Sequence, residues 1–226
     1  MKTKTPKLPL RAFTTWDEDT VSTELGLNQV SRSAALDEWL SSQYSGSEVE
    51  RTQIEVLRQF LAENVILWNE DELKFKFLGP LMQIINFDER RFRAFTQRKI
   101  EAVIGKDQPI RIGGIVDFMV AMGRVNPRHP FFFLHEYKKE RGSANDPLAQ
   151  VLVEMLAAQT LNGNDATTTM HGCYIVGRNW FFLVLEGNEY AVSDAFVATQ
   201  DDIFQIVAIL KSMKQKVQQV VSLLSS

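Results

Sequence analysis

Two apolar runs in this chain carry charged side chains where a buried β-strand normally has none. Residues 114–121 are apolar or glycine apart from Asp117, and the apolar run 131–134 leads into Glu136 and Lys138. Strands that are apolar on successive residues are covered on both faces and lie in the middle of a sheet. An ionised carboxylate there costs several kcal/mol unless a cation, a metal ion or hydrogen-bond donors compensate it. Any fold of this chain must therefore supply partners for these acids.

The spacing of the second run predicts how its charges are arranged. Side chains alternate across a strand, so Glu136 and Lys138 share one face, about 6.6 Å apart along it, and Tyr137 points the other way. If the two strands are neighbours, Asp117, Glu136 and Lys138 form a cluster of two acids and one amine, which suits a magnesium site for phosphoryl transfer. The alternative is structural: an Asp117 to Lys138 ion pair on the sheet, with Glu136 at an exposed strand end.

Composition excludes several classes of protein. The chain has 226 residues, of which 45% are hydrophobic and 23% charged, enough for one substantial α/β domain with an extra segment. Its single cysteine, Cys173, cannot form an intramolecular disulfide and is compatible with a reducing compartment. The N-terminus lacks the apolar core of a signal peptide, and no run approaches the ~20 apolar residues that span a bilayer. We therefore expect a cytoplasmic protein without a membrane partner.

The chain divides near residue 47. Residues 1–47 are polar and irregular, with a helical candidate at 34–40, and are interpreted as an N-terminal arm or small cap. Residues 48–226 are expected to form the main domain. Ser47 precedes a helix that reaches about residue 67, and a second helix runs from Asn69 to about residue 85, interrupted where Gly79 and Pro80 follow each other.

Strands and helices alternate in the rest of the chain. In order, we expect strands at 92–104, 110–121 and 131–138, a helix from 147 to about 160, strands at 170–176 and 180–185, and a helix from 201 to 224. The order α-β-β-β-α-β-β-α predicts an α/β fold with a central mixed β-sheet flanked by helices.

These residues resemble a known nuclease superfamily. Asp117, then Glu136-Tyr137-Lys138, then a helix bearing Gln150, is similar to the PD-(D/E)XK pattern, and residues 69–74 and 177–182 resemble an uncharacterised bacterial branch of it. The resemblance implies a restriction-endonuclease-like core and a nuclease that hydrolyses phosphodiester bonds, with DNA as the expected substrate and RNA left open. Two departures leave the subfamily open: Glu-x-Lys replaces the commoner Asp-x-Lys, and Glu154 stands where recombination-type members have tyrosine.

The same resemblance assigns roles to individual residues. It implies Mg²⁺, for which Mn²⁺ can substitute, bound by Asp117, Glu136 and the carbonyl of Tyr137, with Lys138 orienting the attacking water. It also makes Glu72 and Gln150 candidates, Glu72 for a second metal or a metal-bound water and Gln150 for a phosphate or base.

Other interpretations of these two candidates stay open. Glu72 follows Asn69 by three residues, which is the spacing of a helix capping box. Gln150 is expected on the helix face away from Leu148 and Val151, where an exposed glutamine has no special role.

The expected partners follow from charge and from the last helix. A net charge of −3 gives no overall attraction to nucleic acid, so binding would need a local patch, such as the basic stretch 90–99 with Lys138, Lys139 and Arg141. A stripe in the last helix suggests a homodimer, or a helix packed on its own domain; it consists of Ile203, Ile206, Leu210, Met213, Val217, Val220 and Leu224.

The alternative function is a catalytically silent nuclease-like module that binds nucleic acid or a protein. Zinc-site spacing, a nucleophile elbow and a P-loop are not found.

Overall fold

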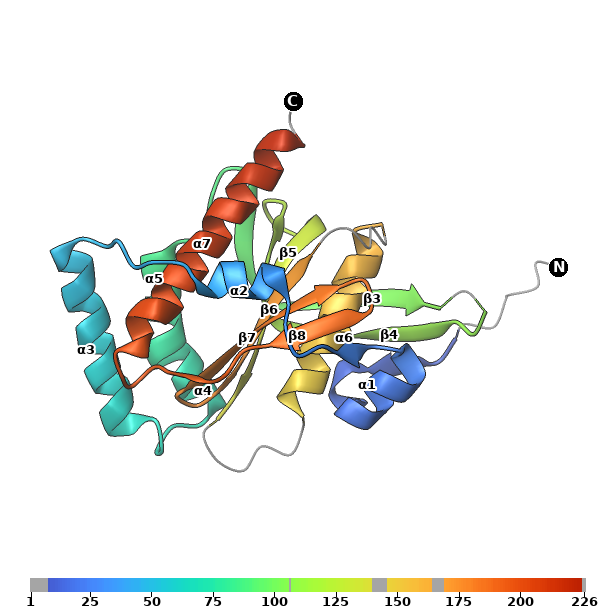
Figure 1. The fold of residues 1–226 in the computed structure, drawn as a ribbon, viewed down its shortest axis with the longest axis horizontal. Coiled ribbons are helices and arrows are strands. Elements are labelled where there is room, and N and C mark those ends of the chain that lie inside the picture. Colours follow the sequence, from blue (N-terminus) through green and yellow to red (C-terminus); the bar gives the residue numbers. More distant parts are fainter. Residues whose placement is uncertain (1–7, 106, 140–145, 164–168, 225–226) are drawn as a thin grey trace.

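The structure is a computed structural model, and it describes residues 8–105, 107–139, 146–163 and 169–224. It is an α/β fold in which one mixed sheet lies between two layers of helices (Figure 1). The predicted α/β class, with a central mixed sheet flanked by helices, is therefore confirmed. None of the helices in these ranges is long and apolar enough to cross a membrane.

All the strands in the described part of the chain belong to a single sheet. They are β1 (Leu10–Ala12), β2 (Asn28–Gln29), β3 (Phe92–Ile104), β4 (Ile110–Met122), β5 (Arg128–Lys138), β6 (Met170–Val176), β7 (Asn179–Glu186), β8 (Glu189–Val192) and β9 (Phe196–Val197). The five strands that apolar patterning predicts are confirmed. The four others have two to four residues each, too few to show a periodic pattern.

The helices include all those that the sequence predicts, together with two in residues 13–25, a stretch interpreted as irregular. They are η1 (Phe13–Thr15), α1 (Glu18–Leu25), α2 (Ala34–Leu40), α3 (Glu48–Asn64), α4 (Glu70–Leu73), η2 (Lys74–Leu78), α5 (Gly79–Ile85), α6 (Pro147–Leu161) and α7 (Asp202–Leu223). The caps expected from the sequence are present: the side chains of Ser47, Asn69 and Asp146 each accept a backbone N–H three residues on.

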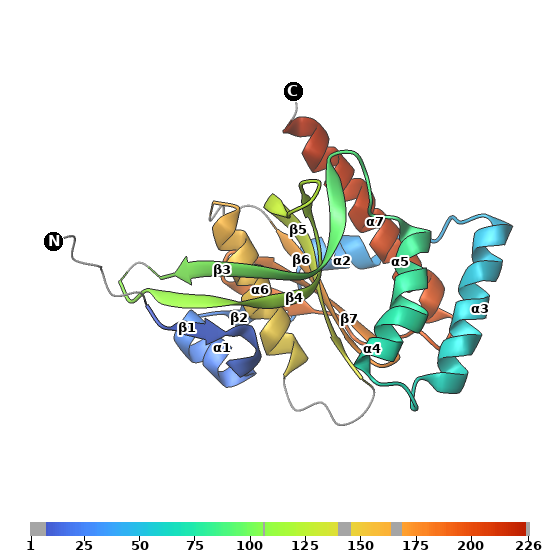
Figure 2. The ribbon, with the colours of Figure 1, turned by 180° about the vertical axis from the view of Figure 1, so that it is seen from behind.

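The centre of the sheet is a three-strand antiparallel meander followed by a crossover. β3, β4 and β5 pair antiparallel in turn, and α6 then carries the chain to β6, which lies parallel to β5. β4 pairs with β3 from end to end except at Asp117, whose opposite position on β3 is Gln97 (Figure 2). Its other edge is divided, because β1 occupies positions 111–113 and β5 occupies 118–122.

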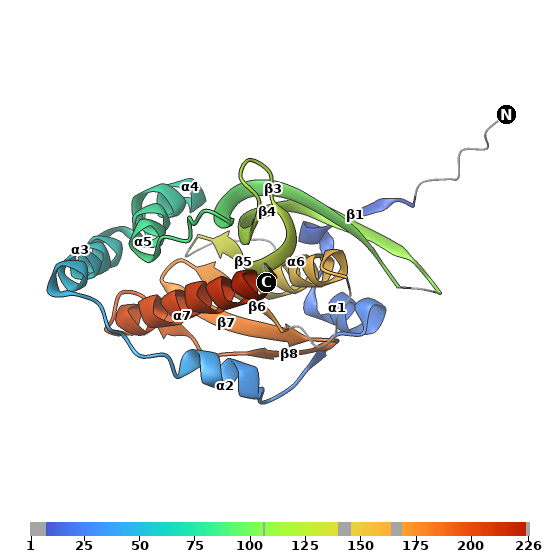
Figure 3. The ribbon, with the colours of Figure 1, turned by 90° about the horizontal axis from the view of Figure 1, so that it is seen from above.

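Two apolar cores lie on opposite faces of the sheet. One contains α2, α3, α5 and α7 packed on residues such as Phe133 and Phe182, and the other contains η1, α1 and α6 packed on residues such as Met119 and Leu183. Seen from above, α7 and α2 lie along one side of the sheet and α6 and α1 along the other (Figure 3). Because α6 is covered by both the sheet and η1 with α1, nearly all of its residues are buried.

The N-terminal segment is part of this architecture. β1 pairs in parallel with β4, and β2 pairs in parallel with β8. Trp39 in α2 is fully buried, and its indole Nε1 donates a hydrogen bond to the carbonyl of Ile209 in α7 at 2.9 Å. The described part of residues 1–47 thus shares the sheet and core of residues 48–226.

The last helix packs on its own domain. Five of the seven stripe residues, Ile203 to Val217, are buried in the core that α7 shares with α2, α3 and α5. Only Val220 and Leu224 are exposed. The stripe is therefore explained by intramolecular packing, and the expectation that it could pair with a second copy loses its basis.

The interruption predicted at Gly79 and Pro80 takes a defined form. Proline has no N–H, and its ring clashes with the carbonyl four residues earlier in a regular helix. The chain instead widens into the π-helical segment η2, where the N–H of Gly79 donates to the carbonyl of Lys74, five residues back. Lys74 is the first residue of this wide turn.

Candidate active site

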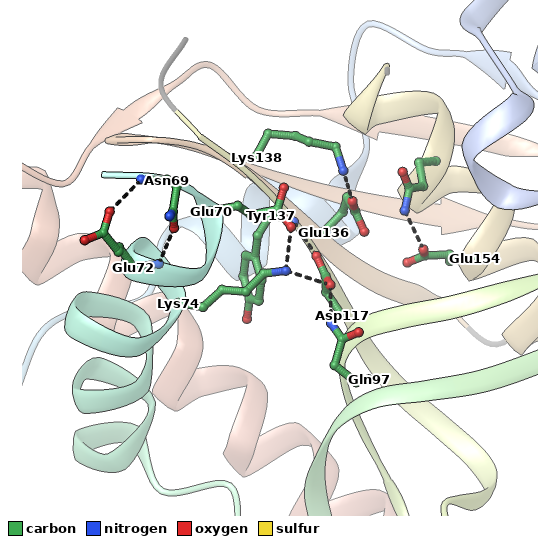
Figure 4. A network of polar contacts seen from close by, with 11 residues as sticks. Asn69, Glu70, Glu72, Lys74, Gln97, Asp117, Glu136, Tyr137, Lys138 and Glu154 are labelled. Atoms are coloured by element: carbon green, nitrogen blue, oxygen red, sulfur yellow. Dashed lines mark hydrogen bonds and ion pairs between the residues drawn. The ribbon is translucent and has the colours of Figure 1, made fainter. Parts of the chain in front are cut away.

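Asp117 and Glu136 meet where β4 and β5 separate. The last opposed pair in the ladder is Phe118 with His135, so Asp117 and Glu136 come next. There the N–H of Tyr137 donates to Asp117 Oδ2 at 3.2 Å instead of to a backbone carbonyl (Figure 4). The separation of two buried strands therefore places both acids side by side, as the two apolar runs predict.

Asp117 is held by two further donors. Its Oδ1 accepts hydrogen bonds from Lys74 Nζ at 2.9 Å and from Gln97 Nε2 at 2.6 Å. Lys74 also bonds Glu70 Oε1 at 2.6 Å; burial acts to lower its pKa, but the bonds to Glu70 and Asp117 outweigh burial and raise it. Gln97 has a φ of 52°, a left-handed conformation that costs a non-glycine residue on the order of 1 kcal/mol.

Glu136 and Lys138 form an ion pair on one face of β5, as strand alternation predicts. Both side chains are almost completely buried, so Glu136 does not lie at an exposed strand end. Burial, with the nearby charge of Asp117, raises the pKa of Glu136 to about 7, and the bond from Lys138 opposes that shift only in part. The structural alternative also needs correction, since Asp117 pairs with Lys74 and not with Lys138.

Glu154 is the residue that sequence reasoning missed. It projects from α6, is fully buried, and accepts a hydrogen bond from Gln150 Nε2 at 3.3 Å. Burial and then the charge of Glu136 raise its pKa well above the ordinary value. Gln150, expected to be exposed, is buried as well, because it shares with Glu154 the face of α6 that is turned toward Glu136. The spacing of four residues between the two is the signal that could have joined them.

The side-chain oxygens of the cluster are of the chemical type that a divalent cation prefers. Three buried oxygens have no hydrogen-bond partner: Glu136 Oε2, Glu154 Oε2 and Gln150 Oε1. Magnesium and manganese prefer oxygen ligands, and buried oxygens without donors are places where an ion or water completes a site. Within the described ranges, no three His, Cys, Asp or Glu side chains are arranged to hold a metal. Lys74 and Lys138 instead neutralise Asp117 and Glu136.

Glu72 lies outside this cluster. Its backbone N–H donates to Asn69 Oδ1 at 2.8 Å, and its own Oε2 accepts from the N–H of Asn69 at 3.0 Å, which is a complete capping box. It also pairs with Lys76 at 2.7 Å. The acid of this helix that approaches the site is Glu70, through Lys74 (Figure 4).

Replacing Asn69 with alanine separates the two interpretations of Glu72. We expect Asn69→Ala to lower the free energy of unfolding by about 1 kcal/mol, because the first turn loses its cap. Glu72→Gln keeps the capping box and should leave stability within about 0.5 kcal/mol. Urea unfolding measures both variants. If Glu72→Gln instead abolished an activity without changing stability, Glu72 would belong to the chemistry and not to the cap.

The basic stretch expected to bind phosphate is partly exposed. Arg90, Arg98, Lys99 and Lys139 are exposed, and Lys99 pairs with Glu101. Arg141 lies outside the described residues. Arg98 and Lys99 lie on β3 and Lys139 follows β5, close in sequence to Gln97 and Lys138.

Comparison of the chain with protein-family models and with curated protein sequences finds no match.

Proposed function

We propose that this protein is a magnesium-dependent nuclease of the PD-(D/E)XK type, with a restriction-endonuclease-like core. One observation carries the proposal: two acids from neighbouring strands, with an ammonium group beside them, lie next to buried carboxylate oxygens that lack partners. The meander β3-β4-β5 followed by the crossover helix α6 and the parallel strand β6 supports it, because the superfamily core has that order.

The proposal gives each residue a role. Asp117, Glu136 and the carbonyl of Tyr137 would hold the cation, which supplies charge neutralisation and a more acidic bound water. Lys138 keeps a positive charge beside Glu136, where it can orient the attacking water or approach a phosphate oxygen. Lys74 must release Asp117 if that carboxylate is to bind a cation.

Glu154 and Gln150 form the buried wall of the site. Burial raises the pKa of Glu154 well above its ordinary value, so a second full charge beside Glu136 is disfavoured there. Because α6 is covered on both sides, this wall also keeps bulk water away from Glu136.

DNA is the proposed substrate, and a cleavage assay tests it. Purified protein is incubated with plasmid and with single-stranded DNA in Mg²⁺, in Mn²⁺ and in EDTA, beside Lys138→Ala. We expect metal-dependent cleavage, reduced about 10²-fold or more in the variant. Lys216→Ala is the matched control, because Lys216 also pairs with a glutamate, Glu38 on α2. Cleavage that survives in EDTA, or in Lys138→Ala at full rate, would contradict the proposal.

A second candidate function has an observation of its own. Each carboxylate of the pair already has an ammonium partner, Lys74 for Asp117 and Lys138 for Glu136. That arrangement favours a catalytically silent module that keeps the nuclease-like fold and binds nucleic acid or a protein. No cleavage under any condition, together with DNA binding that does not depend on metal, would favour the module.

A further inference from the structure

A pocket of about 330 Å³ opens next to the candidate site, between the helical segment η2-α5 and the sheet. Phe75, Leu78 and Met82 line it from the helical side, and Gln97, Asp117 and Tyr137 line it from the strands. The pocket therefore shares Asp117 and Tyr137 with the proposed metal site. Whatever occupies it lies immediately next to the bond that the site would cleave.

Phe75 is the unusual residue of this pocket. Its ring is 83% exposed, although it sits beside Phe77 and Leu78, which are buried in the core. A large aromatic ring left in solvent at the edge of an apolar pocket offers a flat face to a ligand. Planar stacking on such rings is how proteins bind nucleic-acid bases without their duplex partners.

The polar groups of the pocket point to the same kind of ligand. Gln97 lies opposite Asp117 in the β3-β4 register, and its left-handed backbone accompanies a side-chain amide bonded to Asp117 Oδ1. Amide groups of this type recognise the edges of bases. A phosphate group is disfavoured here, because Asp71 and Asp117 also line the pocket and would repel it.

We propose that this pocket receives an unpaired nucleobase, stacked on Phe75, from the nucleotide next to the scissile phosphodiester. The inference rests on the proposed function, since it takes the neighbouring phosphodiester as the substrate. A base within a duplex is stacked on both sides and cannot enter such a pocket without leaving the helix. The substrate class is therefore single-stranded nucleic acid, or a strand with an unpaired base.

Equilibrium binding tests the pocket separately from cleavage. Fluorescence anisotropy in EDTA measures the affinity of the full chain for a labelled single-stranded DNA, a single-stranded RNA of the same sequence, and the DNA duplex. We expect single strands to bind more tightly than the duplex. Phe75→Ala should weaken single-strand binding about tenfold, and Phe75→Trp should retain it, because stacking on one aromatic ring has that order of effect. Comparison of the DNA and RNA arms identifies which sugar the site accepts.

A substitution at an exposed apolar residue outside the pocket serves as the control. Leu67→Ala removes a side chain that is 78% exposed but lies outside the pocket, and it should bind like the unaltered protein. Because Phe75 is exposed, its substitution should leave the melting temperature unchanged. Tighter binding to the duplex, no binding of single strands, or equal affinities of Phe75→Ala and Leu67→Ala would each overturn the inference. Binding that depends on Phe75 in a protein without cleavage would keep the pocket and remove the nuclease.

Discussion

Replacing Glu136 with glutamine is expected to abolish cleavage and to stabilise the fold at the same time. Glu136 is buried beside Asp117, and its pKa is raised to about 7 from an ordinary value near 4.5. The change to an amide removes one of the two proposed metal-binding carboxylates, so we expect cleavage to fall by about 10³-fold or more. It also removes a charge that burial disfavours.

The pH dependence of this stabilisation follows from the direction of the pKa shift. A carboxyl group whose pKa is higher in the folded state adds stability below its unfolded pKa, and that stability is lost as the pH rises through the folded value. The cost of ionised Glu136 therefore grows from about pH 4.5 and is complete above about pH 7. We expect Glu136→Gln to raise the free energy of unfolding by about 1–3 kcal/mol at pH 8 and by little at pH 5.

Urea unfolding at both pH values measures the effect, with Glu63→Gln as the control. Glu63 is an exposed residue of α3, so the same chemical change there should alter neither stability nor cleavage. A Glu136→Gln protein that cleaves normally would remove this residue from the mechanism. A variant that is less stable at pH 8 would show that the ion pair with Lys138 outweighs the cost of burial.

The second large effect is expected at Trp39, in the N-terminal segment. This side chain is fully buried, packs edge-on against Phe133 and Phe182, and donates its N–H to the carbonyl of Ile209. Trp39→Ala leaves a large cavity between α2, α7 and the sheet, and should lower the free energy of unfolding by about 3–5 kcal/mol. Trp39→Phe keeps most of the packing but loses the hydrogen bond, so it should lower the free energy of unfolding by only about 1–2 kcal/mol.

This experiment also tests whether residues 1–47 form a unit of their own. If the segment belongs to the same cooperative core, far-ultraviolet circular dichroism should show one unfolding transition, shifted as a whole in Trp39→Ala. Two transitions, of which only a small one moves, would mean that the segment unfolds separately. Val49→Ala on α3 serves as the control, since Val49 is mostly exposed.

The sequence predicts the central strands and the face shared by Glu136 and Lys138 because these depend on local rules. Continuous apolar runs mark buried strands, and a period of two fixes which side chains share a face. The same is true of the caps at Ser47 and Asn69, whose side chains bond backbone groups three residues away. Such features require no knowledge of what packs against them.

The remaining partners in the candidate site depend on tertiary packing. Lys74 reaches Asp117 from 43 positions earlier in the chain, and Glu154 lies near Glu136 only because α6 crosses over the sheet. Gln150 is buried by the same crossover, because it lies one helical turn before Glu154 on the same face of α6. The contacts of Lys74 with Asp117 and of Glu154 with Glu136 have no signal in the spacing of residues. Local patterns predict where the charges lie, and the packing decides which charges face each other.

The wide turn η2 makes the site unusually sensitive to chain length. Lys74 bonds Asp117 from a helix that carries one extra residue per turn between Lys74 and Gly79. Loss of a single residue from this turn would restore ordinary helical pitch and rotate Lys74 by about 100° relative to α5. Conservative substitutions in this turn would be tolerated more easily than the deletion of one residue, because a deletion turns both the Lys74 ammonium group and the buried Leu73 beside it away from their partners.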